Sequence, residues 1–317
     1  MTAALAAARA SGLLAAGAPV VVLLSGGRDS VCLLDVTVEL AGAPAVVALH
    51  VNYGLRAESD LDERHCAELA DRLGVSFAAH RAEAPPAVGN LHGWARDVRY
   101  AAAVAAAGPR DAVIATGHTR TDQAETVLYR LASSPGRRAL LGMAPRRDRL
   151  VRPLLTVTRE ETAEHCRARG LAWCEDTLNS DPRFARARVR DGLLPALRAI
   201  HPAAEENVVR TAELLRDEAA ALDALVDGAL EGRDDIALEA LAALPDAVAR
   251  LVVRRMAERA TGAFCPRAAA RLPDLFALGD GALDLGDGAR AVVRGGVLSF
   301  TVSTGRAGPG PAFRSDP

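Results

Sequence analysis

The segment Ser25–Ser30, with the sequence SGGRDS, has the residue types of a phosphate-binding loop. It follows an apolar run at Val20–Leu24 and precedes another, which predicts a buried strand, a turn and a helix. Glycines such as Gly26 and Gly27 let the backbone approach a phosphate closely. The free N–H groups and partial positive charge at the start of a helix attract the same anion, and two serine hydroxyls add donors.

Asp29 does not fit plain anion binding, because its carboxylate would repel a phosphate. It fits a Mg²⁺ ion that bridges to the phosphate, so we predict Asp29 as a metal ligand. The simpler alternative is an ordinary strand–turn–helix junction in which a serine or aspartate caps the helix.

A second segment with the residue types of an active site is ATGHTRTDQAETVLYRL, residues 115–131. A strand is predicted to end at Gly117-His118, and Asp122 and Glu125 share one face of the helix that follows. Such a pair of carboxylates can bind Mg²⁺ or an ammonium group, and can help to remove a proton from that group. The alternative is a capping box with Asp122 as N-cap and Glu125 at the third helical position, and both roles are compatible.

Two groups of arginines are candidates for binding phosphate. Arg96 and Arg99 lie three residues apart on a predicted helix, where two guanidinium groups can clamp a pyrophosphate or an RNA phosphate. A denser group at residues 183–190 would attract a phosphate backbone; it comprises Arg183, Arg186, Arg188 and Arg190. The alternative for both groups is solvated arginines paired with nearby acids, namely Asp97, Glu175, Asp176 and Asp181.

The composition restricts the chemistry of the chain. All 38 basic residues among its 317 are arginine, which excludes a Walker-type lysine, a lysine Schiff base and a lysyl-AMP intermediate. The net charge of −2 gives no general support for nucleic-acid binding, although a local patch remains open. Five cysteines at irregular spacing favour reduced thiols in a cytoplasmic protein. No apolar span is long enough to cross a membrane.

The elements that would position these residues alternate between strands and helices. Strands are predicted at 20–24, 45–51, 76–80 and 112–117, and helices at 2–16, 31–40, 60–73, 94–107 and 122–131. We therefore expect an α/β fold with a mainly parallel sheet, helices on both faces, and ligands at the carboxyl ends of the strands. A catalytic domain is expected at 1–195, a smaller, mostly helical domain with a late β hairpin at 196–305, and a disordered tail at 306–317.

Several motifs resemble one family. SGGRDS is similar to the pyrophosphate loop of the N-type ATP pyrophosphatases, or PP-loop proteins. Within them, five segments in order resemble the tRNA(Ile)-lysidine synthetases, in a short-tailed form, over about residues 18–200: HVNYGLRAES, ARDVRY, GHTRTDQAET, RPLL and EDTLNSDPRFARARVRDGLLPAL. The chain departs from that pattern at Tyr53, where histidine is common, at Ser133-Ser134, where the family has Arg-Gly, and at Ala187, where it often has asparagine.

The resemblance implies an activity. An enzyme of this family adenylates the wobble cytidine of a CAU-anticodon tRNA(Ile) with ATP and Mg²⁺. The ε-amine of free L-lysine then replaces AMP at carbon 2 to form lysidine. Neither an iron–sulfur cluster nor zinc is expected, no membrane partner is expected, and a homodimer is left open. The alternatives are a PP-loop tRNA thiolase and a non-catalytic module that binds nucleotide or RNA.

The resemblance also implies roles for individual residues. His50 would meet adenine through its backbone. The expected catalytic residues are Asp29, Asp122, Glu125 and Arg99, and the expected Mg²⁺ ligands are Asp29 and Asp122. The expected ATP-binding residues are Ser25, Gly26, Gly27, Arg28, Asp29, Ser30, His50 and His118. The expected tRNA-binding residues are Arg96, Arg137, Arg138, Arg186, Arg188 and Arg190, with further tRNA contacts from the C-terminal domain.

Overall fold

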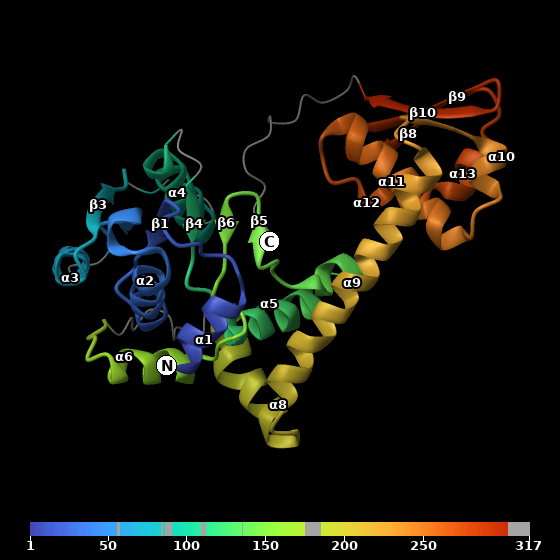
Figure 1. Ribbon diagram of the computed structural model, residues 1–317. Coiled ribbons are helices and arrows are strands. Elements are labelled where there is room, and N and C mark those ends of the chain that lie inside the picture. Colours follow the sequence, from blue (N-terminus) through green and yellow to red (C-terminus); the bar gives the residue numbers. More distant parts are fainter. Residues whose placement is uncertain are drawn as a thin grey trace. The chain divides into compact units, whose positions relative to one another are not determined.

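The computed structural model describes residues 1–55, 58–83, 85, 91–108, 112–134, 136–174 and 185–303 (Figure 1). The chain forms two compact units, Met1–Glu213 and Leu214–Pro317. The first unit extends beyond residue 195, because Val209 at the start of α9 (Ala204–Leu230) packs with Ala124, Leu128 and Leu194. The predicted tail at 306–317 and Arg183 lie outside the described residues. Within the described part of the chain, no helix has both the length and the apolar character that a membrane span requires.

The first unit is built on a six-stranded sheet in the order β3-β2-β1-β4-β6-β5. Neighbouring strands are parallel except β5 and β6, which confirms the predicted α/β class with a mainly parallel sheet. The strands are β1 (Val20–Leu23), β2 (Val46–Asn52), β3 (Ser76–Arg81), β4 (Val113–Ala115), β5 (Arg146–Arg147) and β6 (Leu150–Val151). The short β5–β6 hairpin was not predicted, since two-residue strands leave no detectable alternation in the sequence.

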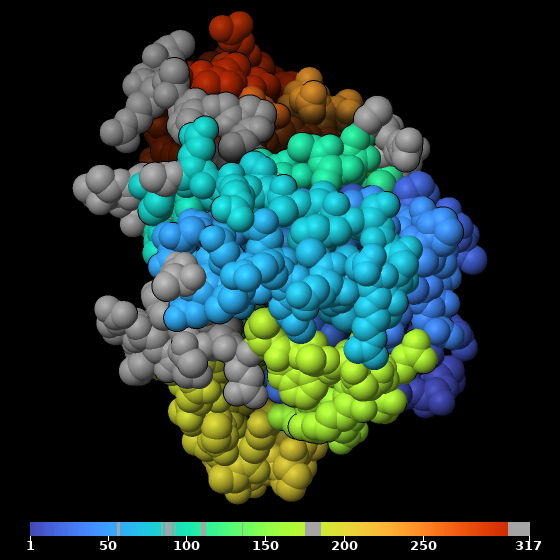
Figure 2. Space-filling view, turned by 90° about the vertical axis from the view of Figure 1, so that its left-hand side faces the viewer, coloured from blue at the N-terminus to red at the C-terminus, as the bar shows by residue number. Residues whose placement is uncertain are grey.

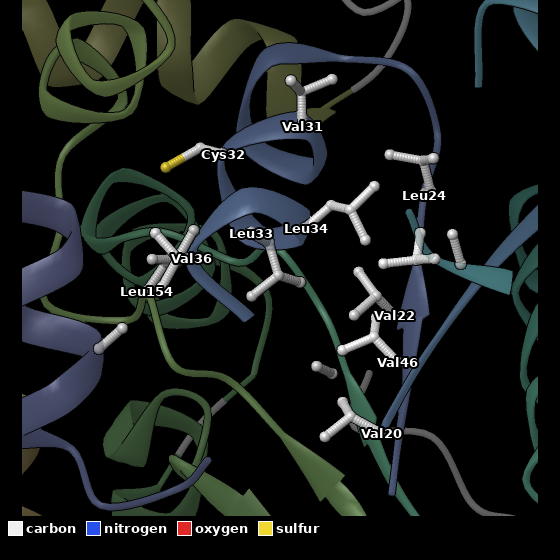
Figure 3. Close-up of a cluster of buried hydrophobic side chains, with 14 of the residues drawn as sticks. Val20, Val22, Leu24, Val31, Cys32, Leu33, Leu34, Val36, Val46 and Leu154 are labelled. Atoms are coloured by element: carbon white, nitrogen blue, oxygen red, sulfur yellow. The ribbon is translucent and has the colours of Figure 1, made fainter. Parts of the chain in front are cut away.

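Helices cover both faces of this sheet, as the sequence predicts. On one face, alternate residues of β1 pack against α2 (Arg28–Ala41), and Figure 3 shows Val22 and Leu24 pointing toward Leu34 and Val31. Side chains of α1 (Ala3–Ala10), α3 (Ser59–Arg72) and α6 (Arg159–Ala168) complete this cluster. Burial of these apolar side chains is the main force that holds the helices on the sheet.

On the opposite face, the intervening residues of β1, Val21 and Leu23, pack against Ala103 of α4 (Leu91–Ala107). This alternation follows from the two-residue period of a strand. At the sheet edge, β3 has mostly exposed side chains, and the light-blue to cyan segment that includes α3 and β3 covers much of the surface in Figure 2.

The strand order creates a crevice at the centre of the sheet. From β1 the chain continues through α2 to β2 on one side, whereas β4 lies on the other side of β1. Loops that leave β1 and β4 therefore diverge at their carboxyl ends, and ligands of open parallel sheets bind at such a point. The loop Ser25–Gly27 follows β1, and Thr116–Thr119 follows β4.

Helix α1 ends at Ala10, earlier than the predicted Ala16. Ser11 is its C-cap, and Gly12 has a φ of 62°, a left-handed conformation that ends helices and favours glycine. Helix α5 (Arg120–Ser133) begins earlier than predicted, and α7 (Ala185–Arg188), a π turn η4 (Val189–Leu193) and α8 (Leu194–Ile200) follow in the same unit.

The second unit combines helices with a small antiparallel sheet of order β7-β10-β9-β8. Its elements after α9 are β7 (Asp235–Ala237), α10 (Leu238–Ala242), α11 (Asp246–Thr261), α12 (Pro266–Ala270), α13 (Leu272–Ala277), β8 (Gly281–Gly286), β9 (Ala289–Arg294) and β10 (Val297–Val302). The expected late hairpin is therefore part of a four-stranded sheet. Its core includes Met256, Leu275 and Leu298.

Candidate active site

A pocket of about 810 Å³ lies at the carboxyl ends of β1 and β4. Its wall includes Ser25, Gly27, Arg28, Asp29 and Ser30 of the first predicted loop and His118 and Asp122 of the second. Two predicted sites that are nearly a hundred residues apart in sequence therefore share one pocket. The predicted Arg96, Arg99, Arg186 and Arg190 line it as well.

The loop Ser25–Gly27 is shaped by its own hydrogen bonds. Ser30 Oγ donates to the carbonyl of Gly27 at 2.7 Å and accepts from the backbone N–H of Ser25 at 3.1 Å. The Ser30 hydroxyl therefore braces the loop instead of presenting its proton to a phosphate. Gly27 is the N-cap of α2 and no side chain caps this helix, so its N-terminus faces the pocket without a competing side-chain acceptor.

Two glycines permit the close packing of this loop. Gly26 has a φ of 83°, a conformation that L side chains rarely adopt. Gly117, in the other loop, has no such conformation, but a Cβ on it would lie 2.9 Å from the backbone oxygen of Asp29 and 3.2 Å from the nitrogen of Ser30. The sequence places Gly117 at a strand end but gives no sign of this contact.

Replacing Gly117 with alanine should therefore displace the phosphate loop. The new methyl group meets backbone atoms that cannot rotate away, so we expect ATP binding at least 10-fold weaker and a loss of about 1–3 kcal/mol in the free energy of unfolding. Titration calorimetry with ATP and thermal unfolding would measure these effects. Gly228→Ala is the matched control, because a Cβ there meets nothing within 4 Å. Equal ATP affinity in the two variants would contradict the prediction.

Asp29 is held by three partners. Thr162 donates its hydroxyl to Oδ1, and the guanidinium groups of Arg28 and Arg159 each approach a carboxylate oxygen at 3.3 Å. Arg159 and Thr162 lie on the first turn of α6, more than a hundred residues away in the sequence. Sequence reasoning missed both, because nothing in their local pattern indicates a contact with the loop.

The two carboxylates of α5 differ in position. Thr119 is the N-cap and Asp122 the third helical residue of a capping box, with Oδ2 of Asp122 2.8 Å from the backbone nitrogen of Thr119. The alternative box with Asp122 as N-cap and Glu125 at the third position is therefore wrong. The sequence Thr-Arg-Thr-Asp held a signal for the correct box. Asp122 reaches the pocket, whereas Glu125 is only 4% exposed.

The carboxyl group of Glu125 has a strongly raised pKa. Burial, followed by the nearby charge of Asp122, raises its pKa to about 7, although Arg190 and Arg159 act in the opposite direction. Its Oε1 is buried and, among the described residues, has no hydrogen-bond partner. A carboxyl group in this state can exchange a proton near neutral pH.

Positive charge dominates the remaining wall. Among the described residues, the arginines that line it are Arg28, Arg96, Arg99, Arg159, Arg186, Arg190 and Arg198. Burial, together with the positive charges of Arg152 and Arg99, holds the pKa of His118 well below its ordinary value, so this ring is neutral. Arg190 and Asp191 belong to the π turn η4, a type of turn that is frequent at functional sites. Such a wall suits a polyanion.

Some predicted residues do not line the pocket. His50 is not part of the wall, and its Nδ1 lies 2.9 Å from the carbonyl oxygen of Leu24. The expected backbone contact with adenine stays a prediction. The others outside the wall are Gly26, Glu125, Arg137, Arg138 and Arg188. For these arginines, tRNA binding also stays a prediction.

Several lining residues were not predicted. Tyr53, which stands where the family has histidine, contributes its ring and donates its hydroxyl to the carbonyl of Ala95 at 2.9 Å. Buried Glu205 accepts from Thr121 Oγ1 at 2.9 Å and pairs with Arg198, and so fixes two further wall residues. Trp173 and Cys174 close another part of the wall.

The donor set at this pocket fits Mg²⁺ held jointly with phosphate. Asp29 and Asp122, the predicted Mg²⁺ ligands, both line the pocket, as do the carboxylates of Glu160 and Asp191. Within the described ranges, no cluster of three or more His, Cys, Asp or Glu side chains could bind a metal. Mg²⁺ in nucleotide sites usually needs only one or two carboxylates, with phosphate and water completing the shell.

Comparison with known proteins agrees with this geometry. A family model described as the PP-loop domain matches residues 6–197. A tRNA(Ile)-lysidine synthase of Thermobifida fusca is 39% identical over 273 residues, which cover 84% of this chain and 83% of the relative. The chain belongs to the tRNA(Ile)-lysidine synthase family.

Other members of the tRNA(Ile)-lysidine synthase family are longer. The relative from Solibacter usitatus is 43% identical over 260 residues, which cover 79% of this chain but 59% of the relative. The relative from Pseudomonas putida is 38% identical over 244 residues, which cover 71% of this chain and 57% of the relative. The chain thus spans less than two thirds of the length of these relatives.

A solved structure with the same fold is the U34-tRNA thiolase NcsA from Methanococcus maripaludis with its [4Fe-4S] cluster. It superposes with a TM-score of 0.57 at 18% identity and covers 67% of this chain and 78% of the thiolase. At this identity the similarity shows a shared PP-loop fold and carries no argument about the reaction.

Proposed function

We propose that this protein is a tRNA(Ile)-lysidine synthetase, a ligase that forms a carbon–nitrogen bond. The observation that carries the proposal is the meeting of the SGGRDS loop and Asp122 at one arginine-lined pocket, with the buried Glu125 one helical turn from Asp122. The names of the family members support the substrate, a tRNA(Ile), and the product, lysidine.

The first half-reaction would use the loop and the arginines. The N-terminus of α2 and Arg28 would hold the pyrophosphate part of ATP, and Asp29 with Asp122 would hold Mg²⁺, which neutralises phosphate charge. The O2 atom of the wobble cytosine attacks the α phosphorus, the bond to the bridging oxygen breaks, and pyrophosphate leaves. Arg99 would stabilise the charge that develops on the transferring group.

The second half-reaction would use the carboxylates of α5. The ε-amine of lysine normally carries a proton, with a pKa of about 10.4, and must lose it to attack. Asp122 in the pocket wall would hold the ammonium group, and Glu125, with its pKa of about 7, would receive the proton. The amine nitrogen then bonds to carbon 2 of the cytosine, and AMP leaves.

Incubation with ATP, Mg²⁺, labelled lysine and an unmodified CAU tRNA(Ile) tests this proposal directly. Label in the RNA that depends on both ATP and this tRNA is the expected result. AMP release without label in the RNA would indicate that the enzyme activates a substrate but does not attach lysine to this tRNA. The thiolase alternative would then be the next to test. A folded protein with neither signal would indicate a binding module.

The arginines of α7 and η4 should bind the tRNA backbone. Removing one phosphate contact with Arg186→Ala or Arg190→Ala should weaken tRNA binding about 10-fold and reduce the slope of log K against log salt by about 1. Filter binding over a salt series would measure both. Arg9→Ala, an exposed residue of α1, is the control. An unchanged salt slope in the pocket variants would contradict the assignment.

Contacts from residues 196–305 to the tRNA are part of the same proposal.

A further inference from the structure

Two cysteines that lie far apart in the sequence meet at the phosphate loop. A Cβ placed on Gly26 would lie 3.3 Å from Sγ of Cys66 and 3.6 Å from Sγ of Cys174. Both sulfur atoms therefore border the space that the missing side chain of Gly26 leaves. Cys66 comes from α3, and Cys174 follows α6, so no spacing in the sequence indicates this pair.

The backbone around the loop is in contact with both cysteines. Cys174 donates its N–H to the carbonyl of Gly26 at 2.9 Å, and Cys174 pairs with Gly27 in a parallel bridge. The Cys66 thiol donates to the carbonyl of Leu24 at 3.8 Å. A covalent bond between the cysteines would thus fasten the loop to α3 and to the segment that ends at Cys174.

A base lies beside the pair. The Cδ2 atom of His65 is 3.8 Å from the same point near Gly26. The adjacent ring nitrogen, Nε2, is buried and has no hydrogen-bond partner among the described residues. This nitrogen is available to accept a proton from a neighbouring thiol.

The two thiols differ in access. Cys174 is partly exposed and lines the pocket, whereas Cys66 is fully buried. A small oxidant in the pocket would therefore reach Cys174 first, and Cys66 would act as the resolving thiol. This order, an accessible thiol beside a second one, is typical of cysteines that are oxidised reversibly.

We infer that Cys66 and Cys174 form a reversible dithiol–disulfide site that controls nucleotide binding at the loop. A hydroperoxide oxidises the Cys174 thiolate to the sulfenic acid and is itself reduced to water or an alcohol. Nε2 of His65 takes the Cys66 proton as the Cys66 sulfur attacks the Cys174 sulfur. The S–S bond forms, the S–O bond breaks, and the departing hydroxide receives that proton from His65 and leaves as water. The effect on catalysis rests on the proposed function, but formation of the bond does not.

The disulfide should oppose ATP binding. The S–S bond would occupy the space beside Gly26 and draw the Cys174 wall of the pocket toward α3, so the loop could not adjust to the triphosphate. Conversely, bound ATP and Mg²⁺ would cover Cys174 and slow its oxidation.

The test uses the whole purified protein, reduced and then treated with hydrogen peroxide. Peptide mapping by mass spectrometry should find Cys66 linked to Cys174. Calorimetry should show ATP binding at least 10-fold weaker, restored by dithiothreitol. Cys66→Ser should bind ATP normally before treatment and retain that binding after it. Cys265→Ser, which changes a buried cysteine of the second unit, should respond as the unchanged protein does.

Three results would overturn the inference. The first is a disulfide between Cys32 and Cys166 in place of the one between Cys66 and Cys174. The second is a loss of ATP binding after peroxide treatment without any disulfide. The third is a loss of ATP binding in treated Cys66→Ser that equals the loss in the unchanged protein. If that variant misfolds, Cys66→Ala and the peptide map of the unchanged protein still decide. A reduced protein that binds no ATP would refute the proposed function, whereas the peptide map would still confirm or refute the disulfide.

Discussion

Glu125→Gln should separate the two half-reactions. The substitution keeps the shape of the side chain but removes its ability to accept a proton, so we expect lysine transfer to fall about 100- to 10,000-fold. Pyrophosphate release in the presence of tRNA should change little, because the phosphate loop and Asp122 are untouched. Parallel assays of pyrophosphate and of labelled lysine in RNA would measure the two steps. Glu68→Gln, an exposed residue of α3, is the control.

The pH dependence of the same variant gives an independent check. Because the pKa of Glu125 is raised to about 7 in the fold, its neutral form is favoured there. The associated stability is fully present below the unfolded pKa of about 4.5 and is lost as the pH rises through 7. Between pH 5 and pH 8, the unchanged protein should lose about 2–3 kcal/mol relative to the variant. Lysine transfer by the unchanged protein should rise over the same pH range. If the stability of the unchanged protein and of the variant changed equally with pH, this account would be contradicted.

Asp29→Asn should stop the reaction at its first step. The amide cannot supply the charge that Mg²⁺ requires, and it leaves Arg159 without its carboxylate partner. We expect AMP formation to fall at least 100-fold. The affinity for tRNA should fall less than threefold, because it depends on the arginines of α7 and η4. Single-turnover assays with labelled ATP would measure the loss.

Asp71→Asn, on the exposed side of α3, is the matched control for Asp29→Asn. A variant at Asp29 that forms AMP at the normal rate would remove this residue from the metal site. Recovery of activity at high Mg²⁺ concentration would instead support its assignment as a ligand, because weaker binding can be offset by mass action.

The sequence predicted those parts of the site that are local. A strand, glycines and the start of a helix within eleven residues define the phosphate loop, and Asp122 and Glu125 lie one helical turn apart. The contacts of Asp29 with Arg159 and Thr162, and of Gly117 with the loop, join segments that are distant along the chain. The contacts of Asp29 depend on how α6 packs against α2, and the contact of Gly117 depends on the pairing of β4 with β1. No local pattern encodes either arrangement.

The misplaced capping box has a different cause. The alternative with Asp122 as N-cap and Glu125 as third residue places the box three residues too late. The structure shows that Thr119 caps the helix, since its hydroxyl accepts from the Asp122 N–H and its own N–H bonds to the Asp122 carboxylate. Glu125 therefore lies a full turn inside the helix. There it is buried, and burial is the main cause of its raised pKa.

The positive wall of the pocket is made entirely of arginine. A guanidinium group stays protonated at any physiological pH and is a poor nucleophile, whereas a lysine amine with a depressed pKa attacks activated carbonyl and phosphoryl compounds. In the proposed reaction an activated cytosine waits for an external amine. A wall without lysine offers no internal amine to compete for that intermediate, so the enzyme would hold its polyanionic substrate without the risk of attaching it to itself.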